Sequence, residues 1–154
     1  MKHVLIVYHS QEKGNTRKMA ELVAKGVREV PGVEADLVNV NDGRVDVRLA
    51  EKADAYALGS PDYFSYMAGC LKQFFDDLTI AERSGRKVFG KPFVAFVTHG
   101  GGGAAIESVE KLAKNLKLVQ AAPSVLSQGA PEGEAARKSV HLGRALGEYV
   151  LRQK

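Results

Sequence analysis

The residues of this sequence that could do chemistry lie in three short segments, of which the first is residues 10–16. It follows an apolar run and leads into a segment of helical pattern. Hydroxyls, a glycine and the free N–H groups at the start of a helix form a binding site for an anion such as phosphate. Gly14 would let the backbone approach that anion closely. The alternative is an ordinary capped turn, in which Asn15 or Thr16 serves as the N-cap.

The second segment, residues 60–66, is rich in aromatic side chains. Tyr63, Phe64 and Tyr66 fall within four residues, and flat side chains at the edge of a site can stack on a planar ligand. The alternative is that Phe64 or Tyr66 packs down onto the core. We expect this of one aromatic and ligand contact for at least one other.

The third segment, residues 98–103, consists of Thr98, His99 and four consecutive glycines. Glycines lose much chain entropy on folding, which favours a backbone that lies flat against a ligand and donates N–H groups. A flexible turn is the alternative. His99 is placed to touch a ligand, although it could equally bond a neighbouring carbonyl. We expect the other histidines, His3, His9 and His141, to be structural or solvated.

Each of the three segments follows a predicted strand. Short apolar runs predict strands that are buried on both faces at residues 4–8, 55–58 and 93–97. Partly polar runs predict more exposed strands at residues 33–40 and 118–122, the latter ending before Pro123. Apolar spacings of three and four predict helices at residues 16–30, 67–78, 104–116 and 133–152, with a short helix within 42–53.

Strands and helices therefore alternate along the chain, which predicts an α/β fold with a parallel sheet between two layers of helices. The first, third and fourth strands are the most apolar, so a five-stranded sheet of order 2-1-3-4-5 places them inside. Ligands bind such sheets at the carboxyl ends of the strands, near strands 1 and 3. The three segments should therefore converge on one site within a single domain, residues 1–154.

Composition excludes several classes of protein. The chain has 154 residues and a net charge of +4, but its basic residues are spread without interleaved aromatics, so we expect no nucleic-acid binding. The single cysteine, Cys70, excludes an intrachain disulfide and a multi-cysteine metal site; we expect it to be a small core residue. No histidine–carboxylate spacing suggests a metal site. No apolar run is long enough for a membrane span or a signal peptide, so we expect a cytoplasmic protein.

The segments resemble those of the flavodoxin-like FMN-binding proteins. The sequence VLIVYHSQEKGNTRKMAELVA is similar to their phosphate loop, and GSPDYFSYMAGCLKQFFDDL is similar to the loop and helix of the WrbA-like NAD(P)H:quinone oxidoreductases. The resemblance covers nearly the whole chain and implies a flavodoxin-like fold that binds FMN noncovalently. It implies phosphate contacts from Ser10, Gly14, Asn15 and Thr16, isoalloxazine contacts from Pro61, Asp62, Tyr63 and Phe64, and contacts with the other ring edge from Thr98, His99, Gly100, Gly101 and Gly102.

The resemblance implies electron transfer through FMN, with redox partner proteins, or with NAD(P)H and a small electron acceptor, in a monomer or homodimer. The alternatives are an NAD(P)H-dependent quinone or flavin reductase and a binding module without catalysis. Other classes are disfavoured by missing residues. Residues 100–105 fit a dinucleotide fingerprint, but no acidic residue ends the next strand. No nucleophile elbow accompanies the His-Gly-Gly-Gly run of an esterase. The acidic residues of a phospho-receiver domain are also missing.

Overall fold

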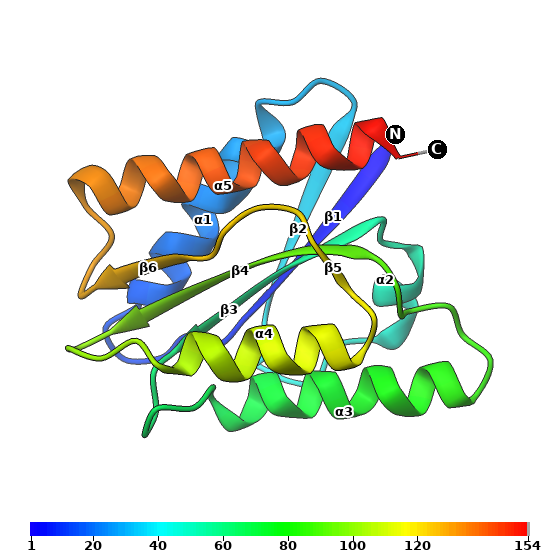
Figure 1. Cartoon of the computed structure of the whole chain (residues 1–154), viewed down its shortest axis with the longest axis horizontal. Helices are drawn as coiled ribbons and strands as arrows, with labels where there is room; N and C mark the ends of the chain where they lie inside the picture. The colour runs from blue at the N-terminus through cyan, green and yellow to red at the C-terminus, as the bar shows by residue number, and fades with distance from the viewer. Residues whose placement is uncertain (154) are drawn as a thin grey trace.

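The sheet at the centre of the molecule is built from strands whose side chains are apolar on both faces. The computed structural model describes residues 1–153. Its strands are β1 (Lys2–Tyr8), β2 (Val33–Asn39), β3 (Ala55–Pro61), β4 (Pro92–His99), β5 (Val119–Gln120) and β6 (Val125–Gln128). Its helices are α1 (Asn15–Arg28), α2 (Val47–Lys52), α3 (Gly69–Arg83), α4 (Ala105–Asn115) and α5 (Gly133–Arg152) (Figure 1).

All strand pairs are parallel, and the order β2-β1-β3-β4-β5 confirms the predicted topology. The fifth strand differs from the prediction because it is broken in two. β5 pairs with the start of β4, and β6 pairs with its end, from Phe96↔Val125 to His99↔Gln128. Pro123 lies in the break, where a residue without an N–H cannot donate to the ladder. The prediction of one strand at residues 118–122 was therefore wrong in its extent.

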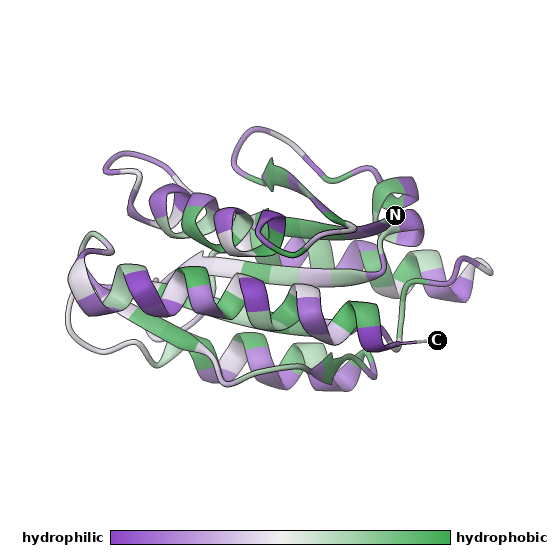
Figure 2. Cartoon of the chain, turned by 90° about the horizontal axis from the view of Figure 1, so that it is seen from above, coloured by the Kyte–Doolittle hydropathy of each residue, from purple (hydrophilic) through white to green (hydrophobic). Residues whose placement is uncertain are grey.

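Two hydrophobic cores fill the space between the sheet and its helices. α1 and α5 cover one face, and α3 and α4 cover the other (Figure 1). Hydrophobic and hydrophilic residues alternate along these helices (Figure 2), as expected for amphipathic elements. Within residues 1–153, no helix is long and apolar enough to cross a membrane.

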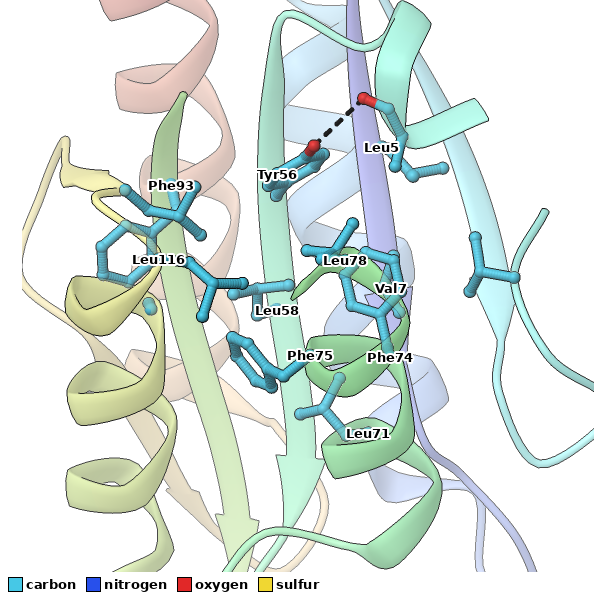
Figure 3. Packing of buried hydrophobic residues seen from close by; sticks show 14 of the residues in the cluster. Leu5, Val7, Tyr56, Leu58, Leu71, Phe74, Phe75, Leu78, Phe93 and Leu116 are labelled. Carbon is cyan, nitrogen blue, oxygen red and sulfur yellow. Dashed lines mark hydrogen bonds between the residues drawn. The ribbon is translucent and has the colours of Figure 1, made fainter. Parts of the chain in front are cut away.

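Tyr56 is a buried residue with a polar group in the core on the α3 side (Figure 3). Its ring packs edge-on against Phe74, and its hydroxyl donates to the carbonyl oxygens of Ala50 and Val88 at 3.0 and 2.9 Å. Burial raises the pKa of this phenol, so it stays protonated and keeps donating. The hydroxyl is thus buried without being left unpaired.

The start of α3 corrects the prediction for Cys70. The helix begins at Gly69, two residues later than the predicted residue 67, and its buried side is formed by Leu71, Phe74, Phe75 and Leu78. Cys70 lies outside this buried set and is exposed. The prediction that it is a core residue was therefore wrong.

Candidate functional site

The loops that follow β1, β3 and β4 enclose a cleft of about 310 Å³. This is within the range of small-molecule sites, which starts at about 300 Å³. The backbone joins two of these loops directly, because the N–H of Asp62 donates to the carbonyl of Thr98 at 2.9 Å. The lining residues are Ser10, Gln11, Glu12, Lys13, Gly14, Asn15, Thr16, Pro61, Asp62, Tyr63, Thr98, His99, Gly100 and Gly129.

The N-terminus of α1 opens into this cleft, and its N-cap residue has no side chain that could cap it. Its N-cap is Gly14, whose φ of 72° lies in the left-handed region that favours glycine. The alternative of a turn capped by Asn15 or Thr16 was therefore wrong. The hydroxyl of Ser10 accepts from the N–H of Arg17 at 3.2 Å, while the N–H groups of Asn15 and Thr16 have no acceptor in residues 1–153. No acidic residue lies in the first turn, so the positive end of the helix can receive an anion.

Two buried hydroxyls form the floor of the cleft. The Oγ1 atoms of Thr16 and Thr98 lie 2.8 Å apart, and both residues are buried. One hydroxyl donates to the other in this pair, which leaves the second hydroxyl a proton for a further acceptor. The pair therefore joins α1 to β4 and still has a donor to offer.

The aromatic segment forms a tight hairpin at the edge of the cleft. Tyr63 and Tyr66 exchange two backbone hydrogen bonds of 2.9 and 3.1 Å, and Phe64 and Ser65 between them have φ values of 56° and 64°. Tyr63 lines the cleft, and its hydroxyl accepts from the Gln11 amide at 3.0 Å. Phe64 is fully exposed at the tip and does not line the cleft. None of the three aromatics is buried, so the expectation that one packs onto the core was wrong.

The glycine run has two distinct parts. Gly100 lines the cleft beside His99, whose Nδ1 atom is buried without a hydrogen-bond partner among the described residues. Gly101 and Gly102 do not line the cleft. Gly103 has a φ of 76°, and a Cβ there would lie 2.8 Å from the Leu126 side chain. This last glycine is thus required by the fold itself.

Comparison with known proteins assigns the family. The family model described as NADPH-dependent FMN reductase matches residues 46–133, more than half of the chain. The chain belongs to this family of flavodoxin-like flavoproteins. It is 38% identical over 107 residues to a flavodoxin of Aquifex aeolicus, covering 70% of this chain and 55% of that protein. It is 38% identical over 96 residues to an NAD(P)H dehydrogenase (quinone) of Geobacter sulfurreducens, covering 48% of this chain and 47% of that protein.

The chain thus spans about half the length of these two curated relatives. Among solved structures, a flavodoxin from the domain Archaea superposes with a TM-score of 0.85 at 23% identity, covering 97% of this chain and 99% of that one. This likeness confirms the predicted flavodoxin-like fold.

The cleft of this flavodoxin-like protein is lined by most of the residues that were predicted from sequence to contact a ligand. Three nominated residues, Phe64, Gly101 and Gly102, lie outside its lining. Four lining residues were missed: Gln11, Glu12, Lys13 and Gly129. The first three lie inside the nominated segment 10–16 and could have been included on position alone. Gly129 follows β6, a strand for which the sequence gives no clear pattern.

A second cavity of about 410 Å³ lies between the β2–α2 loop and the first half of α3. It is larger than the cleft, but its cationic side chain, Arg44, is paired with the buried Asp77. The guanidinium holds the pKa of that carboxyl below its usual range. Because this charge is already neutralised, the cleft with its unpaired N–H donors is the better candidate site.

The carboxylate of Asp62 is expected to stabilise the aromatic hairpin and to join it to the start of α4. Its Oδ1 accepts from the N–H of Ser65 at 2.8 Å, and its Oδ2 accepts from the N–H of Ala105 at 3.3 Å. Asparagine would turn an N–H donor toward one of these N–H groups. We expect Asp62→Asn to lower the free energy of unfolding by about 1 kcal/mol and to speed amide exchange at Ser65 and Ala105.

The matched control for this prediction is Asp42→Asn, at an exposed aspartate whose carboxylate has no hydrogen bond or ion pair within residues 1–153. Urea denaturation and amide hydrogen exchange would measure both variants. Equal stability and equal exchange in the two variants would contradict a stabilising role for the two Asp62 hydrogen bonds.

Proposed function

We propose that the cleft binds FMN noncovalently and that the protein transfers electrons through it. The observation that carries the proposal is the N-terminus of α1, where the N–H groups of Asn15 and Thr16 are unpaired among the described residues and lie beside the hydroxyl pair of Thr16 and Thr98. Unpaired N–H donors, a spare hydroxyl and a helix dipole suit a phosphate. The family description supports FMN as the molecule that brings this phosphate.

The residues present fit the rest of such a cofactor. Tyr63 offers a flat side chain at one wall, and the imidazole of His99 lines another. We propose that Ser10, Gly14, Asn15 and Thr16 hold the phosphate, while Pro61, Asp62, Tyr63, Thr98, His99 and Gly100 surround the ring system. Bound FMN would supply one- and two-electron chemistry. The protein would orient the cofactor and limit its contact with water.

A second candidate function is an NAD(P)H-dependent quinone or flavin reductase. The family-model match favours it, because residues 46–133 include both the aromatic hairpin and the glycine run. In that case the partners would be NAD(P)H and a small acceptor. In the first case they would be redox proteins that exchange electrons at the cleft. We further propose a protein that acts in the cytoplasm as a monomer or homodimer.

Purification followed by anaerobic reduction tests these functions. We expect a yellow protein that releases FMN on denaturation. Bleaching of the bound flavin by NADPH or NADH would support the reductase. Inertness to both, with reduction by a ferredoxin-type donor, would support the electron carrier. A colourless protein whose refolded apo form does not bind added FMN would contradict both and leave a binding module.

A further inference from the structure

His9 is a buried polar side chain that the proposed cofactor contacts do not use. It is only 4% exposed, and neither ring nitrogen has a hydrogen-bond partner among the described residues. Tyr56 is also buried, but its hydroxyl reaches two carbonyl oxygens. Leaving a buried polar group unpaired destabilises a protein. An imidazole left in this state is therefore a feature that needs an explanation.

The imidazole of His9 lies one aromatic ring away from the cleft. The residue follows the last residue of β1 and precedes Ser10, which lines the cleft. Its ring packs edge-on against Tyr63, with the ring centroids 5.8 Å apart and the planes at 77°. Tyr63 lines the cleft, and its hydroxyl accepts a hydrogen bond from the Gln11 amide. His9 thus supports the side chain that would face the cofactor.

The surroundings of His9 disfavour the charged form of its ring. Burial lowers the pKa of His9, and the side-chain amide of Gln11, which could accept a hydrogen bond from the protonated ring, opposes that shift. The titratable side chain in contact with the imidazole is Tyr63, whose ring packs edge-on against it. Because neither ring nitrogen has a partner among the described residues, a negative charge placed in the cleft would act on an imidazole that has no counter-ion.

We propose that His9 is a positioning residue that takes up one proton when the bound flavin is reduced by two electrons. This inference rests on the proposed function. Two-electron reduction of flavin to its anion consumes two electrons and one proton, and protonation of His9 consumes a second proton. The imidazolium then balances the new negative charge, because a nearby opposite charge favours the charged form of a group. The electrons come from the reductant of the assay, dithionite.

The first test follows the imidazole signals of the FMN-loaded protein by NMR across pH 5–9, before and after reduction with dithionite. We expect the pKa of His9 to rise on reduction by at least one unit, a tenfold gain in proton affinity. His141, exposed on α5, is the control residue, and its signals should be the same in both redox states. An unchanged His9 pKa would overturn the inference while leaving FMN binding intact.

The second test measures the two-electron midpoint potential against pH. Between the two pKa values of His9, uptake of two protons gives a slope of about 60 mV per pH unit, and one proton gives about 30. We expect the native protein and the control His141→Gln to show the steeper slope, and His9→Gln to show the shallower one. An unchanged slope in His9→Gln would assign the second proton to another group and overturn the inference.

Protein that binds no FMN would overturn the proposed function and this inference together, whereas yellow protein without the His9 shift overturns the inference alone. His9→Phe checks that the effect is not a folding defect. Replacing an unpaired buried imidazole by an apolar ring should leave the thermal unfolding midpoint unchanged or higher. If His9→Gln does not fold, the NMR titration of the native chain still decides the matter.

Discussion

Replacing Thr16 with alanine is expected to weaken FMN binding by about ten- to a hundredfold and to leave riboflavin binding unchanged. Thr16 lines the cleft at the start of α1. A hydrogen bond to a charged group contributes about 1.5–3 kcal/mol, and each 1.4 kcal/mol is tenfold in affinity. Riboflavin lacks the phosphate, so loss of the Thr16 hydroxyl should not change its affinity. Titration of both flavins into apo-protein measures the difference.

The hydroxyl pair makes this prediction sharper. Because Thr16 and Thr98 share a hydrogen bond of 2.8 Å, Thr98→Val should also weaken FMN binding, and the double variant should lose less than the two single losses added together. Thr79→Ala is the matched control, since that hydroxyl donates to the Phe75 carbonyl on α3. Equal weakening of FMN and riboflavin binding by Thr16→Ala would contradict the assignment of the phosphate to this position.

The sheet order was predictable from sequence because burial leaves a strong signal in parallel strands. β1, β3 and β4 are almost wholly buried, while β2 alternates between buried and exposed residues. Those patterns are enough to place β2 at an edge. The break between β5 and β6 was not predictable in the same way. Each piece is too short for a periodic pattern, and their pairing depends on contacts with β4.

The location of the site was predictable, but the roles of its side chains were not. Topology brings the ends of β1, β3 and β4 together whichever residues follow them. The outward direction of the Phe64 side chain depends on a turn at Phe64 and Ser65 with left-handed φ values. That turn contains no glycine from which it could be predicted. The engagement of Asp62 depends on the N–H of Ala105, at the start of α4. The ring nitrogens of His9 lack hydrogen-bond partners among the described residues. This depends on the side chains that the fold brings near it, which no local pattern in the sequence predicts.

Replacing Gly26 with alanine is expected to destabilise the protein, although alanine is the better helix former by about 1 kcal/mol. Gly26 lies in α1 against α5, where an added Cβ would be 1.9 Å from the carbonyl oxygen of Val140. That oxygen belongs to a helix backbone and cannot swing aside as a side chain could. The two helices must separate, so we expect a net loss of at least about 2 kcal/mol in the free energy of unfolding.

Gly143 makes the reciprocal contact from α5, since a Cβ there would lie 1.9 Å from the carbonyl oxygen of Val23. Gly143→Ala should therefore lose a similar amount. Gly69→Ala is the matched control, because Gly69 begins α3 and its Cβ would meet nothing within 4 Å; propensity alone should keep its stability equal or raise it slightly. Urea denaturation followed by circular dichroism compares the three variants. If Gly26→Ala were as stable as Gly69→Ala, helix propensity would outweigh packing, and the close approach of α1 and α5 would not be what requires glycine here.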